Sequence, residues 1–170
     1  TDLHRAMTPL FKFCIALVVL ASAVQWALWT QIGLGEDVGY YAALAREICR
    51  GHVQYVDFQC SYSPGSLYAI AVLGESLIAE PLALRFYALV VQIANVFLVY
   101  TILRGLSHTK LHALYFAAIF FLWLISLGGT ELMLEPFQNF FLLVGWLVLT
   151  RRPNLMGAAV AGLCVGAAMM

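Results

Sequence analysis

Charged side chains are scarce in this sequence. Asp, Glu, Lys and Arg make up 11% of its 170 residues, whereas a soluble domain averages about a quarter. Apolar residues make up 63%, and the mean hydropathy is +0.89. This excess excludes an ordinary soluble domain and indicates a polytopic membrane protein. The formal net charge is zero, so nothing in the composition indicates a nucleic-acid partner.

Several motifs of well-known enzyme classes are missing as well. The sequence has no glycine-rich phosphate loop, no zinc signature and no serine-nucleophile motif. Its four cysteines include no CxxC pair; Cys49 and Cys60 flank a polar loop and could pair in an oxidising compartment. His108 and His112 straddle a turn, so we expect no metal site there. The sequence requires no cofactor and leaves a divalent cation open.

Long apolar segments dominate the rest of the chain. We expect an all-α fold, a polytopic transmembrane helical bundle, because these segments have the length and composition of membrane helices. Pro81 and Pro136 stand at favoured first-turn positions. Gly162 and Gly166, with several alanines, predict a small-residue packing face. The expected spans are residues 10–29, 81–103, 111–127, 134–149 and 155–170.

The outer loop, residues 30–80, is the one long polar segment between apolar runs. The sequence predicts an amphipathic helix at residues 37–50, because Tyr40, Tyr41, Leu44 and Ile48 share one face. These residues are too few to span a membrane, so we expect the helix to lie at the membrane surface. Gly51 is a typical C-terminal residue for it.

Residues 64–79 predict a second juxtamembrane helix. This apolar segment is interrupted by Gly65, Gly74 and Glu75. A short re-entrant piece is the alternative reading of the same residues.

The charges predict the orientation. Six of the nine basic residues fall on one side of this topology, and eight of the nine acidic residues fall on the other. The positive-inside rule makes the basic side cytoplasmic. The basic residues are Arg5, Lys12, Arg104, Lys110, Arg151 and Arg152.

The outer loop also carries a family resemblance. The segments Gly35-Glu36-Asp37-Val38-Gly39-Tyr40-Tyr41, Tyr55-Val56-Asp57-Phe58 and Tyr62-Ser63-Pro64-Gly65-Ser66-Leu67-Tyr68 resemble the first outer loop of GT-C glycosyltransferases. The nearest group is that of the protein O-mannosyltransferases and aminoarabinose transferases. Leu82-Ala83-Leu84-Arg85 before a long span and an acid in the second outer loop resemble the same group.

The resemblance implies the activity. It implies a membrane enzyme that transfers a sugar, with inversion, from a polyprenyl-phosphate donor to a hydroxyl on a protein, lipid or glycan acceptor. Residues 1–170 would be the N-terminal part of the glycosyltransferase domain, in a bacterial or archaeal plasma membrane, with the site facing outward. The first-loop acid, aligned here with Asp37, would activate the acceptor. The group often has Asp-Glu here, whereas Glu36 precedes Asp37, and the group's lysine is missing from residues 61–66.

The chemistry of the residues agrees with one outer acid. A sugar leaving a lipid phosphate needs a base for the incoming hydroxyl, but no general acid, because phosphate departs as an anion. One carboxylate therefore suffices, unlike the pair used in glycoside hydrolysis. Asp37 follows the first span at the depth of a lipid phosphate. Its alternative role is to cap the helix behind it.

The other candidates have structural alternatives too. Glu131 or Glu135 would hold the acceptor or an ion, or Glu135 would simply favour a helix start. Arg85 would pair with the lipid phosphate, or with Glu80 or Glu75, or extend outward. Asp57, with Tyr55 and Tyr62, would line a sugar pocket, although interfacial aromatics are common. The predicted substrate-binding residues are Glu36, Tyr41, Asp57, Tyr62, Arg85, Glu131 and Glu135.

A second function class fits the composition. A transporter or channel subunit would also be polytopic and would bind membrane lipids. Transporters more often place ionisable residues at mid-membrane and break their helices there. Here the spans are nearly free of charge and the acids lie in outer loops, which favours the enzyme.

Overall fold

The computed structural model describes residues 16, 20, 23, 36–62, 64–106, 109–126 and 134–169. Across these residues the regular structure is helical, apart from an isolated bridge between Gln54 and Phe58. The expected all-α fold is therefore confirmed for the described part of the chain. The expected span 10–29 lies almost wholly outside it.

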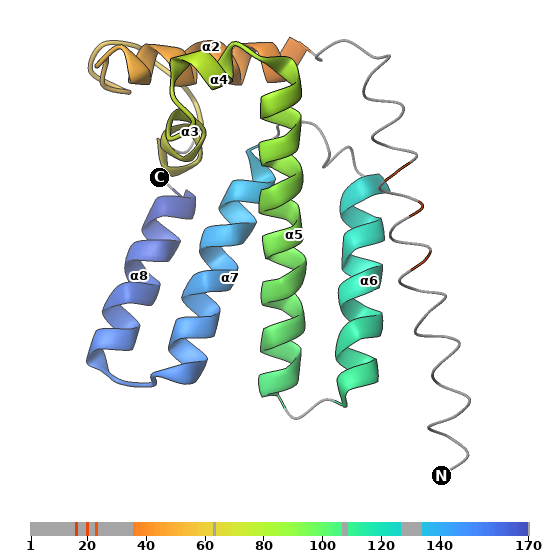
Figure 1. Cartoon of the computed structure of the whole chain (residues 1–170). Helices are drawn as coiled ribbons and strands as arrows, with labels where there is room; N and C mark the ends of the chain where they lie inside the picture. The colour runs from red at the N-terminus through yellow and green to blue at the C-terminus, as the bar shows by residue number, and fades with distance from the viewer. Residues whose placement is uncertain are drawn as a thin grey trace.

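Four long helices stand side by side (Figure 1). Consecutive members run antiparallel, and α5 packs against both α6 and α7, while α8 packs on α7. Every end lies within two residues of the predicted span. The helices are α5 (Pro81–Gly105), α6 (Lys110–Ser126), α7 (Glu135–Arg151) and α8 (Leu155–Met169).

Only α5, among the described helices, is both long and apolar enough to cross a membrane by itself. Its 25 residues extend about 38 Å at 1.5 Å per residue, more than the roughly 30 Å of a bilayer core. Lys110–Trp123 of α6 and all of α8 are shorter apolar helices.

The ends of these helices follow from their sequences. Pro81 and Pro136 stand in the first turns of α5 and α7, where a missing N–H costs nothing. Asn154 caps α8, because its Oδ1 accepts the Gly157 N–H at 2.8 Å. The turns after α5 and α7 lie at the same end of the bundle (Figure 1).

The helix α2 (Glu36–Cys49) lies across the opposite end of the bundle (Figure 1). Gly51, at φ 91°, ends it in a left-handed conformation that suits glycine. The Gly51 N–H donates to the Ile48 carbonyl and the His52 N–H to the Glu47 carbonyl, which is the Schellman pattern. The predicted helix at 37–50 is confirmed.

Residues 64–79 form two short helices rather than the one that the sequence suggested. They are α3 (Pro64–Ala71) and α4 (Glu75–Ile78). The break occurs at Gly74, whose φ of 79° is incompatible with a continuous helix. The two helices run in different directions, with α4 beside α2 (Figure 1).

The buried core lies where α2 meets the bundle. Val38, Tyr41 and Ala45 of α2 belong to one apolar cluster with Leu84 of α5 and Phe137 of α7. Residues of α3 and α4 complete this cluster. At this end α2 and the long helices are therefore one packed unit.

Small residues bring α7 and α8 together, but Gly162 is not among them. A Cβ on Gly162 would meet nothing within 4 Å, so Gly162 does not form the packing face. The close approach is at Gly145 of α7, where a Cβ would lie 3.1 Å from the Cys164 Cβ and 3.3 Å from the Ala161 oxygen. The glycine that allows the two helices to approach therefore lies on α7 and not on α8.

Gly65 gives the closest contact between the outer helices and the bundle. A Cβ at this position would lie 2.0 Å from the backbone oxygen of Ala167 on α8. The neighbouring atom is backbone, so it has no rotamer by which to move away. The contact therefore requires glycine and fixes α3 on the end of α8.

We expect Gly65→Ala to destabilise the protein by about 1–3 kcal/mol, the usual cost of overpacking. Gly39→Ala is the matched control, because Gly39 lies within α2 and a Cβ there meets nothing within 4 Å. It should stabilise α2 by up to about 1 kcal/mol. Thermal unfolding in detergent measures both. Equal midpoints for Gly65→Ala and the wild type would show that α3 does not rest on α8.

Candidate functional site

Three tyrosines gather above the core. Tyr41, on α2, is 6% exposed, whereas Tyr40 and Tyr62 are 47% and 38% exposed. The Tyr41 and Tyr62 rings are perpendicular, with centroids 5.0 Å apart, and Tyr40 lies 6.3 Å from Tyr62. This edge-to-face arrangement is favourable for aromatic pairs. We call these three residues the tyrosine cluster.

Two carboxylates from distant parts of the sequence act on this cluster. Burial, followed by hydrogen bonding with Tyr62, raises the pKa of Tyr41, and the charges of Asp37 and Glu135 raise it further. Asp37 lies one turn before Tyr41 on α2, and Glu135 is the first residue of α7. Both carboxylates are exposed. The charge of one acid from each predicted outer loop therefore acts on the same hydroxyl.

The loop between α2 and α3 holds Tyr62 in place. The Tyr62 carbonyl accepts hydrogen bonds from Gln54 Nε2 at 2.7 Å and from the Tyr55 hydroxyl at 2.8 Å. Tyr55 has φ 69°, a rare conformation for a bulky residue. Such strain persists only where the surrounding structure enforces it, so the contacts of this loop hold it in one defined conformation.

Asp57 has a structural role in the same loop. Its Oδ2 accepts the Val53 N–H at 2.6 Å, and its own N–H donates to the Val53 carbonyl at 2.8 Å. One carboxylate oxygen thus closes the turn. The substrate role of Asp57 stays a prediction.

An ion-pair network joins α2 to α4. One Glu75 oxygen accepts from Arg50 Nε at 3.0 Å and Nη2 at 2.7 Å, and it lies 3.8 Å from Arg46 Nε. Glu47 accepts from Arg50 Nη1 at 2.9 Å and lies 2.6 Å from His52 Nδ1. These side chains are partly exposed, so the network orients α2 more than it stabilises the fold.

The remaining predicted site residues are Glu36, Arg85 and Glu131. Glu36 is the first residue of α2. Arg85 is half-buried one turn into α5, at the end of the bundle that α2 covers. Glu131 lies outside the described residues. Of the predicted residues, the structure thus brings Tyr41 and Tyr62 into contact, and the charges of Asp37 and Glu135 act on Tyr41.

Sequence reasoning missed the residues that support the cluster. Gln54 is 4% exposed and carries no signal in the sequence beyond its residue type. Tyr40, half-exposed beside the buried Cys60, was predicted only as part of one face of the helix. The pairing of Arg50 with Glu75, 25 residues further along the chain, was not predicted either.

The cysteines of the loop do not pair. Cys49 Sγ donates to the Ala71 carbonyl at 3.3 Å, and Cys60 is buried next to Tyr40; both are free thiols. Within the described residues, no three His, Cys, Asp or Glu side chains form a group that could hold a metal ion.

Comparisons of the chain with models of protein families, with curated proteins and with solved structures gave no match.

The network makes a pH prediction through Glu47. Its hydrogen bond with His52 is the main cause that lowers the pKa of Glu47 below the ordinary value of 4.5, with the charge of Arg50 acting the same way and burial opposing. A lowered pKa in the folded state means a contribution to stability that is complete above pH 4.5 and is lost as the pH falls through the folded value.

Glu47→Gln should therefore unfold at a lower temperature than the wild type above pH 4.5, and this difference should shrink as the pH falls below it. Thermal unfolding of both proteins across this range measures the effect. A difference that stays constant with pH would contradict the described network.

Proposed function

We propose that this protein is a membrane glycosyltransferase that moves a sugar from a polyprenyl-phosphate donor to a hydroxyl acceptor on the outer face, with inversion. The observation that carries the proposal is that the charges of Asp37 and Glu135, one from each predicted outer loop, both act on the Tyr41 hydroxyl in the tyrosine cluster. An acid in each outer loop is what the resemblance to GT-C glycosyltransferases implies.

The surface of the long helices supports a polytopic membrane bundle. Phe97 on α5, Trp123 on α6, Trp146 on α7 and Leu163 on α8 are 56–75% exposed. A monomer in water rarely exposes large apolar side chains on every helix of a bundle. Lipid is the medium in which such a surface is stable.

The charge distribution supports the orientation. Arg104, Lys110 and Arg151 lie at the end of the bundle opposite α2. The positive-inside rule then places this end in the cytoplasm and the tyrosine cluster outside. The cluster would lie near the outer membrane surface, where the phosphate of a lipid-linked sugar resides.

Asp37 is the proposed base. The acceptor oxygen attacks the anomeric carbon, its proton passes to the Asp37 carboxylate, and the bond from that carbon to the phosphate oxygen breaks. The phosphate keeps the electron pair, so the step needs no general acid. Attack opposite the leaving group inverts the configuration.

The neighbouring residues would bind the two substrates. Tyr41 and Tyr62 offer aromatic faces and hydroxyls, both of which suit sugars. Glu135 would orient the acceptor, and Arg85 would pair with the donor phosphate. Glu36, Asp57 and Glu131 are the remaining proposed contacts, with Asp57 limited to its second oxygen because the first closes the turn.

A non-enzymatic polytopic protein is the second candidate, and one observation favours it. Gln92, near the middle of α5, is fully buried, and neither polar atom of its amide has a partner among the described residues. An unpaired buried amide costs about 1–3 kcal/mol. Polar groups at mid-membrane often mark a transport pathway.

The substitution Asp37→Asn tests Asp37 as the base. Asp37 is the second residue of α2, inside the helix rather than at the predicted capping position. Asparagine keeps the shape of the side chain but removes the proton acceptor. We expect normal expression and donor binding, with transfer reduced about a hundredfold or more. Transfer of a radiolabelled sugar from a polyprenyl phosphate by the full-length protein measures this.

Asp37→Ala is the matched variant. If Asp37 only stabilises the start of α2, Asp37→Asn keeps nearly normal turnover and Asp37→Ala loses folded protein. Wild-type turnover of Asp37→Asn would exclude Asp37 as the base and make Glu36 the next residue to test. A wild-type protein without transfer activity on any lipid-linked sugar would favour the transporter.

A further inference from the structure

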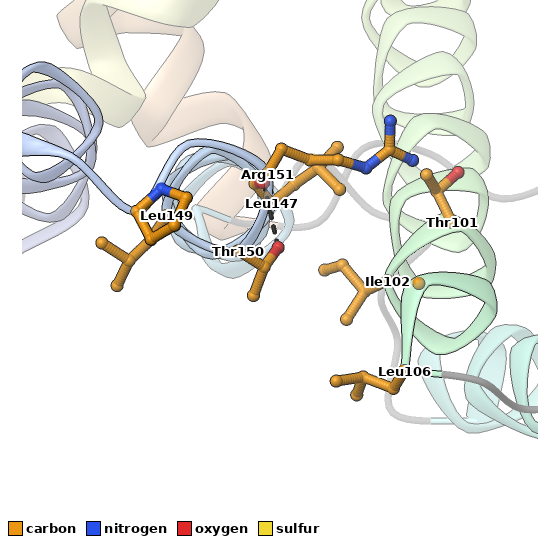
Figure 2. A pocket seen from close by; sticks show the side chains of 9 residues that line it. Thr101, Ile102, Leu106, Leu147, Leu149, Thr150 and Arg151 are labelled. Carbon is orange, nitrogen blue, oxygen red and sulfur yellow. Dashed lines mark hydrogen bonds between the residues drawn. The ribbon is translucent and has the colours of Figure 1, made fainter.

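A second site lies at the other end of the bundle, between the last turns of α5 and α7 (Figure 2). The cavity has a volume of about 350 Å³, at the small end of the range of roughly 300–1,000 Å³ for ligand sites. Its lining includes apolar side chains, two hydroxyls and one cation. Among the residues that line it are Thr101, Leu106, Leu149, Thr150 and Arg151.

Arg151 supplies the charge of this cavity. Its side chain extends from α7 toward Thr101 on α5 (Figure 2). The described residues provide no ion pair or side-chain hydrogen bond for it. A guanidinium has five donors that match a phosphate in pairs, so it is suited to an anion that the protein itself does not provide.

The hydroxyls of the two threonines indicate which group of the ligand lies next to its anion. The Thr101 hydroxyl donates to the Phe97 carbonyl at 2.8 Å, and the Thr150 hydroxyl donates to the Leu147 carbonyl at 3.0 Å. Because their protons are engaged, their oxygens are free only to accept. They therefore suit a hydroxylated group next to the anion.

The position of the cavity indicates a lipid rather than a soluble ion. It lies at the level where both α5 and α7 end, which is the headgroup depth if these helices cross the membrane. Leu106 and Leu149 are 53% and 44% exposed beside it, so an acyl chain could continue the apolar contact outward. A basic pocket between membrane helices on the cytoplasmic side is typical of anionic lipid sites.

We infer that this cavity binds an anionic phospholipid with a hydroxylated headgroup, of the phosphatidylglycerol type. Arg151 pairs with the phosphate, the threonine oxygens accept from the headgroup hydroxyls, and Leu106 and Leu149 contact the chains. This inference shares the membrane placement of the proposed function but does not depend on sugar transfer.

Native mass spectrometry of the detergent-purified protein, titrated with phosphatidylglycerol at moderate salt, tests the site directly. Arg151→Gln should weaken phosphatidylglycerol binding roughly fivefold or more, the effect of one basic contact. Arg152→Gln is the matched control, since it removes the same charge one residue away, outside the cavity lining. It should change binding by less than about twofold, because Arg152 does not line the cavity and makes no direct contact with the phosphate there.

A second variant keeps every charge. Leu106→Trp fills the cavity mouth and should also weaken binding, whether or not Arg151→Gln folds. Equal losses for the two arginine variants, or unchanged binding in Leu106→Trp, would overturn the assignment. Binding of phosphatidylcholine as tight as that of phosphatidylglycerol would also overturn it. Displacement of the lipid by glycerol 3-phosphate or inorganic phosphate would overturn it too and would indicate a soluble ligand. The readout is independent of transfer, so either proposal can fail alone.

Discussion

The packing of α2 across one end of the helical bundle is the constraint on which the rest depends. Val38, Tyr41 and Ala45 turn the apolar face of α2 onto Leu84 and Phe137, and this face is buried. Each such side chain is worth about 1.5–3 kcal/mol when fully buried, less for alanine. Because Asp37 lies on the same helix, the packing that buries Tyr41 also fixes the carboxylate beside it.

Three further contacts restrain α2 and its neighbours. Gly65 lets the backbone of α3 meet α8, Glu75 pairs with Arg50, and the Tyr87 hydroxyl donates to the Ala69 carbonyl at 2.8 Å, joining α5 to α3. The first and third involve backbone atoms, which have little freedom to move. The site is therefore supported by rigid elements, as precise chemistry requires.

The sequence predicted the helices well because their signals are local. The start of a helix at Pro81 or Pro136 and the end of one at Gly51 depend on residues within one turn. The observed helices begin and end at or within two residues of these positions. The division of residues 64–79 was missed because Gly74 marks a possible break without fixing its conformation.

The candidate site was predictable only in part. Charged residues are scarce in this sequence, so Asp37 and Glu135 were identified as candidates from the sequence, but their common effect on Tyr41 was not. The contacts of Tyr62 with Tyr41 and of Glu75 with Arg50 join residues 21 and 25 positions apart, and such pairings depend on how the loop folds. The predicted packing face of Gly162, Gly166 and alanines on α8 is correct for Ala161, which lies against α7, and wrong for Gly162. Gly145 on α7 was missed because composition alone does not say which helices approach each other.

The central claim is that the tyrosine cluster faces outward and the basic turns face the cytoplasm. Cysteine accessibility in intact cells tests it most directly, in a version whose native cysteines are replaced by alanine. Val56, 79% exposed in the loop beside the cluster, and Arg152, exposed in the turn after α7, are the two probe positions. The account predicts that a membrane-impermeant maleimide labels Val56→Cys in intact cells and labels Arg152→Cys only after permeabilisation. Labelling of both from the same side, or of Arg152→Cys alone in intact cells, would contradict it.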